Sequence, residues 1–478
     1  MSKLPDDCLN EIFECLDDDK VTLYSCLLVN RLWCQVSVRI LWRNIGTSNF
    51  NTLIECLSKE SKKILNDNGI RISTPTSKFP TFNYVTFCKT LSVNEISYKV
   101  EEFLKIQQII NNKHMMIEEI FKMFMNQISS LKSLEFLRNI NINFILYPGA
   151  KDSLKNLSEL HCSSSISSEF FCQLTQISHN LLLLDIKIED CISDGIEDLI
   201  SSQKNLKSFY ITLNNYDLTD TVLNNLVLLL MTKLPKTLIR LIFCGRMRSI
   251  PLSFIKNFTN LQELQLSFDY TKCFLDFEKL QYANLPQLQI LKIQHACPRY
   301  EFLIKFIENN GKNLKELYMG DIRGHSDNLL NLAIAEFCPN LRKLSTGFKD
   351  DELETLKIIL NNCKYLERIK IWCGSEYLSE KEALEIIAKY SQENISELIL
   401  YHQDCIQSEE LLPDELDSFF TSWMNRMPQK SLSLEIVKCD NDVSLDTNHE
   451  NMRLIEKYTK LGFIKNFKIT DFDYYEYQ

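Results

Sequence analysis

The chain has 478 residues, of which 45% are apolar and 24% are charged, so its length suits several domains or one elongated repeat array. Its formal net charge is −10 and its Lys and Arg residues form no dense cluster, which argues against nucleic acid as the main partner. The longest purely apolar run, residues 226–231, is too short to span a bilayer, so no membrane partner is expected.

Seventeen cysteines are scattered singly through apolar stretches, with no CxxC pair among them. The seven histidines show no ligand spacing, so the sequence predicts no metal site and no other cofactor. The N-terminus lacks the apolar segment of a secretory signal. We therefore expect buried thiols, no structural disulfide, and a cytoplasmic or nuclear location, or both.

The first forty residues predict three short helices. The first has one apolar stripe with helical spacing, formed by Leu9, Ile12, Phe13 and Leu16. A second helix is expected over about residues 20–29, and Asn30 has the residue type of an N-cap for a third helix. On pattern alone, these helices could either dock a partner or merely cap the structure that follows.

The order of residue types in this segment resembles the F-box: Leu4-Pro5-Asp6, then Ile12-Phe13, then Val29-Asn30-Arg31 with Trp33. In that family the segment meets the Skp-type linker subunit of SCF ubiquitin ligases, and through it a cullin scaffold. The resemblance, which covers residues 1–45, implies linker contacts by Leu4, Pro5, Leu9, Ile12, Phe13, Leu16, Leu28, Val29 and Trp33.

Residues 46–156 are less regular, and we interpret them as a connecting region with irregular first repeats. Residues 82–87 alternate as a divergent strand would, and residues 100–130 have a helical pattern. Loops are expected at residues 66–80 and 139–153, where Pro and Gly occur.

From residue 157 onward a short unit, apolar-x-x-apolar-x-apolar, recurs along the chain. Its first positions are Leu157, Leu183, Leu206, Leu238, Leu261, Leu288, Leu314, Leu341, Leu366 and Ile395. The first and the last of these positions lie 238 residues apart over nine intervals, so one repeat is about 26 residues long. Each copy predicts a short strand followed by a helix, and only stacking of neighbouring copies can bury the apolar face of each.

The repeats resemble cysteine-containing leucine-rich repeats, as in the segments Cys191-Ile-Ser-Asp-Gly-Ile and Cys338-Pro-Asn-Leu. The expected fold class is α/β. A small three-helix F-box precedes a curved leucine-rich-repeat solenoid over residues 157–470, with parallel strands on the concave side and helices on the convex side. Residues 471–478 form an acidic tail.

In each repeat the residues beside the inward apolar positions should point out of the sheet, at positions such as Lys187 in the second copy. Toward the C-terminal end these outward positions hold aromatic and aliphatic residues, which are enriched in recognition surfaces. The sequence predicts target binding at Tyr318, Lys370, Trp372, Ile399 and Tyr401, unless neighbouring loops or the acidic tail cover them.

The sequence contains no nucleotide-binding, zinc-protease or serine-hydrolase motif, so the chain is not expected to be an enzyme. The adjacent His161-Cys162 pair could suggest a nucleophile, but Cys162 falls on an inward repeat position. The preferred hypothesis is a substrate-recognition adaptor of an SCF-type ligase that binds a Skp-type linker and an unknown target protein. The alternative is a non-catalytic scaffold whose F-box-like segment does not support ubiquitylation.

Overall fold

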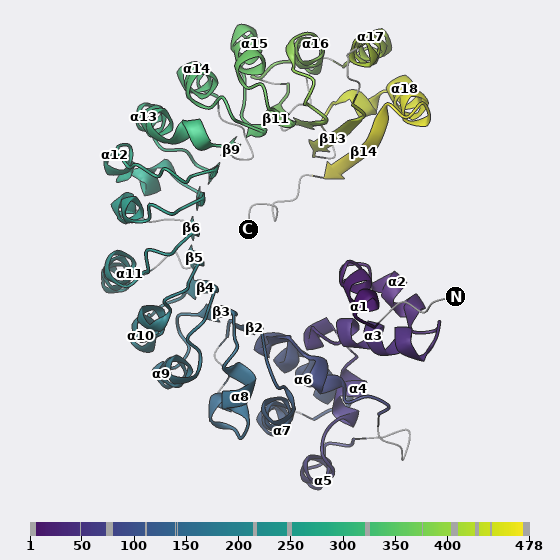
Figure 1. The fold of residues 1–478 in the computed structure, drawn as a ribbon, viewed down its shortest axis with the longest axis vertical. Coiled ribbons are helices and arrows are strands. Elements are labelled where there is room, and N and C mark those ends of the chain that lie inside the picture. The colour runs from purple at the N-terminus through teal and green to yellow at the C-terminus, as the bar shows by residue number, and fades with distance from the viewer. Residues whose placement is uncertain are drawn as a thin grey trace. The chain divides into compact units, whose positions relative to one another are not determined.

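The structure of the chain is a computed structural model, which describes residues 6–47, 49–72, 80–109, 112–138, 140, 142–213, 218–245, 251–320, 326–374, 376–402, 410–425, 430–439 and 442–471. Two compact units make up the chain, Met1–Pro235 and Lys236–Gln478. Each unit contains parallel strands with helices along one side of them (Figure 1).

The N-terminal unit begins with three short helices and continues as strands and helices. Its described helices are α1 (Asp6–Glu14), α2 (Lys20–Cys26), α3 (Arg31–Leu41), α4 (Phe50–Glu55), α5 (Lys59–Asp67), α6 (Val93–Ile106), α7 (Lys113–Gln127), α8 (Ala150–Leu154), α9 (Ser168–Ile177), α10 (Gly195–Ser202) and α11 (Asp220–Thr232). Its described strands, each parallel to the next, are β1 (Thr90–Ser92), β2 (Ser133–Phe136), β3 (Glu159–Ser163), β4 (Leu183–Ile188) and β5 (Ser208–Leu213).

The C-terminal unit repeats the same alternation. Its described helices are α12 (Phe277–Leu280), α13 (Tyr300–Asn310), α14 (Asn328–Phe337), α15 (Leu353–Asn362), α16 (Glu380–Tyr390), α17 (Pro413–Met424) and α18 (His449–Lys460). Its described strands, again parallel to their neighbours, are β6 (Arg240–Gly245), β7 (Glu263–Phe268), β8 (Ile290–His295), β9 (Glu316–Gly320), β10 (Lys343–Ser345), β11 (Arg368–Trp372), β12 (Glu397–Tyr401), β13 (Leu432–Lys438) and β14 (Ile464–Asp471).

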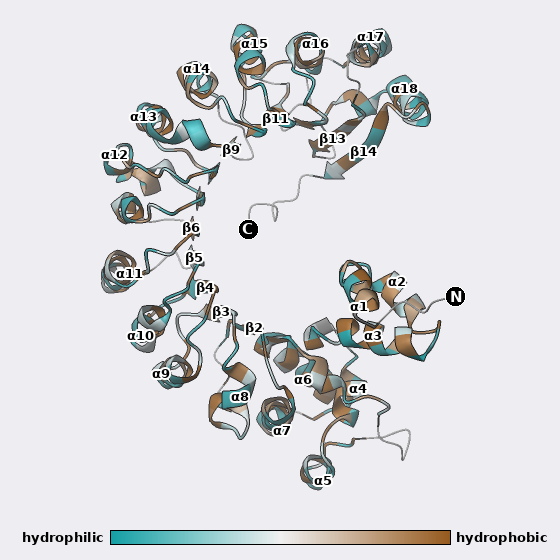
Figure 2. Cartoon of the chain, in the orientation of Figure 1, coloured by the Kyte–Doolittle hydropathy of each residue, from teal (hydrophilic) through white to brown (hydrophobic). Residues whose placement is uncertain are grey.

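The strands have two faces of different character. In β5, Phe209 and Ile211 are buried toward the helices, whereas Tyr210 is half-exposed on the opposite face, here called the inner face. The helices carry both hydrophobic and hydrophilic residues (Figure 2), as expected where one face of each helix covers the sheet. The predicted α/β class, with an N-terminal helical segment followed by a leucine-rich-repeat solenoid, is confirmed.

The predicted register of the second repeat is wrong by two residues. Leu184, and not the predicted Ile186, pairs with the inward Leu160 of β3, so Leu181 is the first position of this repeat and is fully buried. The residue between the inward positions is consequently Asp185 rather than Lys187. The four successive leucines at residues 181–184 offered several equivalent alignments, and pairing with β3 selects one of them.

The connecting region already contributes to the sheet of the N-terminal unit. The strand expected over residues 82–87 is wrong, because Tyr84–Phe87 forms a short 3-10 helix, η2, and the strand β1 follows it. β1 and β2 pair in the register that the later repeats continue, with Leu91 opposite Leu134 and Leu134 opposite Leu160.

One backbone contact recurs between successive repeats. A single carbonyl oxygen accepts hydrogen bonds from two consecutive N–H groups of the next repeat, as Lys89 does from Lys132 and Ser133 at 2.8 and 3.0 Å. The same contact occurs one step earlier, where the Arg43 carbonyl, just after α3, accepts from Lys89 and Thr90 at 2.8 and 2.9 Å. The three-helix segment is therefore joined to the first strand as a preceding repeat would be.

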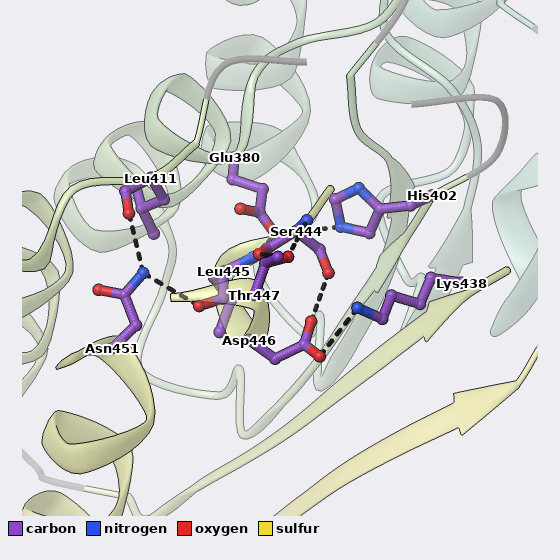
Figure 3. Close-up of polar contacts among 9 residues, drawn as sticks. All are labelled: Glu380, His402, Leu411, Lys438, Ser444, Leu445, Asp446, Thr447 and Asn451. Carbon is purple, nitrogen blue, oxygen red and sulfur yellow. Dashed lines mark hydrogen bonds and ion pairs between the residues drawn. The ribbon is translucent and has the colours of Figure 1, made fainter. Parts of the chain in front are cut away.

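A buried polar network ties the last repeats of the C-terminal unit together (Figure 3). Glu380, at the start of α16, accepts a hydrogen bond from the Leu445 N–H at 3.1 Å and pairs with His402 Nε2 at 3.0 Å. Asn451 of α18 donates to the Leu411 and Leu445 carbonyls at 2.8 and 3.0 Å. These contacts connect α16 and α18 with the end of β12 and with the short 3-10 helix η7 (Leu445–Thr447), and the side chains of Glu380, His402 and Asn451 are almost fully buried.

Candidate interaction surfaces

The three N-terminal helices enclose a small core of their own. Its buried members are Leu9, Phe13, Leu23, Cys26, Val36 and Ile40, with Leu16 and Trp33 packed partly buried against them. The Phe13 and Trp33 rings meet edge to face, with centroids 5.1 Å apart. Asn30 caps α3 as predicted, because its side chain accepts a hydrogen bond from the Trp33 N–H at 3.0 Å.

Several large apolar side chains of this segment lie outside that core. Val21, Tyr24 and Leu28 follow the i, i+3, i+7 spacing of one helix face along α2 and its continuation, and all three are exposed. Leu28 is 90% exposed, and Val29 beside it is also exposed. We call these four residues the α2 stripe. An apolar helix face left in solvent is typical of a protein-binding surface.

The nine predicted linker-binding residues fall into distinct environments. Ile12, Leu28 and Val29 are exposed, whereas Leu9 and Phe13 belong to the core of the three helices. Leu4 and Pro5 lie outside the described residues. Val21 and Tyr24 were missed, although their helical spacing from Leu28 could have indicated them.

The three-helix segment is fastened to the first repeat by side chains as well as by its backbone. Arg43 pairs with Glu14 of α1 and thereby holds the end of α3 against α1. The Trp42 and Tyr84 rings lie 4.4 Å apart, centroid to centroid, so η2 packs on the last residues of the segment. Packing contacts, and not a flexible connecting peptide, therefore set the orientation of the three-helix segment relative to β1.

On the inner face of the C-terminal unit, the five predicted target-binding residues come together. Lys370 Nζ lies 4.2 Å from the Tyr401 ring centroid, and also contacts the rings of Tyr318 and Trp372. Ile399 packs beside Trp372 and Tyr401 in one buried cluster. A cation held over aromatic rings is stabilised by their negative faces.

Most of this cluster is not exposed, in contrast to the prediction. Trp372 is 2% and Tyr401 1% exposed, and Ile399 is also buried, because the aromatic rings pack on one another and on Val437. Gly320 makes room for Trp372: a Cβ atom there would lie 2.7 Å from the indole ring. Of the five predicted target-binding residues, only Tyr318 and Lys370 are partly accessible, so a partner could contact only these two.

His161 and Cys162 lie on opposite faces of β3. The hydrogen bond to Asp185 Oδ2, 3.0 Å from His161 Nδ1, raises the pKa of His161 against the opposing effect of burial. Cys162 is completely buried on the other face, where desolvation raises the pKa of its thiol. A histidine that points away from the thiol cannot deprotonate it, so the pair does not form a nucleophilic site.

Within the described ranges, no helix is long and apolar enough to cross a membrane. Nor do His, Cys, Asp and Glu side chains gather in threes or more into a possible metal site in that part of the chain.

Comparison with known proteins agrees with the N-terminal geometry. A family model described as F-box-like matches residues 1–48. No curated protein matches the chain. Among solved structures, Rad7, from its complex with Elc1 in yeast, is similar at 12% identity and a TM-score of 0.36, over 93% of this chain and 95% of that one.

The leucine-rich-repeat-containing protein LegL7 from Legionella pneumophila is similar at 15% identity and a TM-score of 0.34, over 61% of this chain and 90% of that one. The family match and the repeat geometry described above lead to one conclusion. The chain carries an F-box-like domain at its N-terminus, followed by a leucine-rich-repeat solenoid.

Proposed function

We propose that the chain is a substrate-recognition adaptor of an SCF-type ubiquitin ligase. The F-box-like domain would bind a Skp-type linker and through it a cullin scaffold, while the inner face of the repeats would bind a target protein. The chain itself would supply proximity rather than chemistry, because holding a target lysine near a charged ubiquitin raises its effective concentration. Such an adaptor would work in the cytoplasm or the nucleus.

The observation that carries this proposal is the α2 stripe. Its four apolar side chains are exposed on a domain whose core is complete without them, so they have no evident role in folding. Residues of this kind stabilise an interface when a partner covers them. Together with Ile12 of α1, they would offer a Skp-type linker five exposed apolar side chains.

The joint to the first repeat supports the same proposal. Because the Arg43 carbonyl binds two N–H groups of the first strand, a linker bound to α2 would have a defined orientation relative to the adjoining repeats. A defined orientation is needed if a target held by repeats is to meet a ubiquitin carried by other subunits.

The same joint favours one alternative, a scaffold whose F-box-like domain only caps the solenoid. A capping role would require the domain's core and the Arg43 contact but would not depend on the exposed α2 stripe. The two functions therefore differ in what a substitution on the stripe does.

Affinity purification of the full chain from cells with inhibited proteasomes, followed by mass spectrometry, tests the proposal. The wild-type chain should recover linker, cullin and ubiquitylated target, and Leu28→Asp should lose the first two while the target remains bound without ubiquitin. Recovery of partners that are never ubiquitylated would show the scaffold function instead, and unchanged recovery of linker and cullin by Leu28→Asp would show that the α2 stripe does not dock the linker.

A further inference from the structure

A hollow of about 360 Å³ opens on the inner face of the C-terminal unit, across β8, β9, β10 and β11. Its walls are two rows of side chains on the inner face, and each row runs across the strands. We call it the Ser345 hollow. Its main lining residues are Lys292, Tyr318, Lys343, Ser345, Arg368 and Lys370.

The strand register explains why a hollow forms at this place. Ser345 lies opposite Tyr318 of β9 on one side and opposite Lys370 of β11 on the other. A small side chain thus stands between two long ones in the same row, which leaves space above it. The Lys370 amino group and the Tyr318 hydroxyl, 3.4 Å apart, lie over this space.

The floor of the hollow contains a polar group that lacks a partner. The Ser345 hydroxyl is buried and makes no hydrogen bond to any residue that the structure describes. Buried hydroxyls are nearly always hydrogen-bonded in folded proteins, because an unpaired one carries a desolvation penalty. A ligand atom that accepts a hydrogen bond would satisfy it.

The charges around the hollow favour a ligand with a single negative charge. Lys343 pairs with Glu316 at 2.8 Å, Arg368 with Glu397 at 2.6 Å, and Lys292 lies 3.7 Å from Glu263.

Together with Lys370, the four cations that line the hollow outnumber their three paired carboxylates by one. This excess attracts an anion. Glu316, however, lines the hollow itself and would repel a doubly charged phosphate more strongly than a carboxylate.

We propose that the Ser345 hollow binds the carboxylate of an aspartate or glutamate side chain in an extended segment of the target protein. The carboxylate would accept hydrogen bonds from the Ser345 hydroxyl and from the neighbouring ammonium groups, which are stronger than bonds between neutral groups. The proposal rests on the adaptor function, and it specifies the chemistry that the adaptor recognises.

An array of short immobilised peptides, with random flanking positions around a fixed central Asp, Asn or phosphoserine, provides the probe. The purified full chain should bind Asp-centred peptides roughly tenfold more than Asn-centred ones, as expected for a charge-assisted contact. Equal binding to both sets would overturn the proposal, and stronger binding to phosphoserine would overturn the assignment of a singly charged ligand.

Three variants locate the binding. Ser345→Leu fills the hollow and Lys343→Gln removes one of its charges, so each should reduce the preference for Asp to about twofold or less. Lys468→Gln is a matched control, because Lys468 also pairs with a glutamate on a strand of this unit but does not line the hollow. Its preference should equal that of the wild type, and an equal loss in all three variants would contradict the proposal.

This result is separable from linker docking. A chain that binds the linker but shows no preference for acidic peptides would refute the Ser345 hollow alone. A chain that prefers acidic peptides but does not bind the linker would refute the adaptor function alone.

Discussion

Ile12 and Phe13 are neighbours in α1, yet their side chains face opposite environments. Ile12 is 49% exposed, whereas Phe13 is 2% exposed and packs against Trp33. Their helical spacing predicted one stripe but could not tell which of its members face the domain's own core. Which residues of α1 face the core depends on where α3 packs. The residues that face the core stabilise the domain, and the exposed ones are available to a partner.

Phe13→Ala should therefore destabilise the F-box-like domain itself. Loss of a buried phenylalanine leaves a cavity and costs about 3–5 kcal/mol, whereas Ile12→Ala should change stability by about 0.5 kcal/mol or less. Urea unfolding of the two variants, followed by hydrogen exchange in residues 6–47, measures both effects. Equal stability of Phe13→Ala and the wild type would show that Phe13 is not a core residue.

The thiols should differ sharply in reactivity. Burial raises the pKa of Cys88 and of Cys363 to about 12, while Cys8, Cys15, Cys191 and Cys439 are exposed. At pH 8 a buried thiol is protonated and inaccessible, so iodoacetamide should label the exposed cysteines first and the buried ones only after denaturation. Rapid labelling of Cys88 in the native chain, or a stable intrachain disulfide in protein blocked at lysis, would contradict this.

The same pKa shifts imply a loss of stability in alkali. A thiol whose pKa is higher in the folded chain than in the unfolded chain favours folding below the unfolded pKa of 9.0. Its contribution is lost as the pH rises through 9 toward the folded value of about 12. The free energy of unfolding should thus fall between pH 9 and pH 11 as the buried thiols ionise on unfolding.

Among the elements, the strands were more predictable than the segments between them. The inward pair of each strand, such as Leu264 and Leu266 in β7, repeats with little variation. The four leucines at residues 181–184 misled the alignment because any register within them preserves an apolar pattern. The register of β4 is set by its hydrogen bonds to β3, which join residues about 24 positions apart in the sequence.

An asparagine contact between repeats went unnoticed, although the sequence carries a signal for it. Asn260, Asn313 and Asn340 each precede the first leucine of a repeat, and each donates a hydrogen bond from its side chain to a carbonyl of the preceding repeat. The Asn-Leu pairs recur with the repeat period and could have been recognised. They show that neighbouring repeats are joined by side chains as well as by the strand backbone.

The buried network of Figure 3 should hold the last repeats of the C-terminal unit in place. Glu380→Ala removes the buried acceptor of the Leu445 N–H and the carboxylate beside His402, and a buried donor left without a partner costs about 1–3 kcal/mol. Hydrogen exchange should then accelerate in residues 442–451. Glu385→Ala, on the exposed side of the same helix, is the matched control and should leave exchange unchanged. An equal effect of both substitutions would show that the network does not fasten these repeats.

At the scale of the whole molecule, the order of domains was readable from the sequence but the state of the inner face was not. Alternation correctly placed Trp372 and Tyr401 on the face opposite the helices. It could not show that they bury each other, since this depends on Gly320, which lies 52 residues from Trp372 in sequence. The Ser345 hollow beside them remains accessible, and its shape follows from the alignment of the four strands β8, β9, β10 and β11.

The central claim is that the chain docks a Skp-type linker through the α2 stripe. Calorimetric titration of purified linker into the full chain tests it most directly, with Leu28→Asp compared with Leu329→Asp, the same substitution at an exposed leucine of α14. We expect Leu28→Asp to weaken binding by about 2 kcal/mol or more, roughly 30-fold, and Leu329→Asp to leave the dissociation constant unchanged. No binding by the wild-type chain, or equal affinity of both folded variants, would contradict the account.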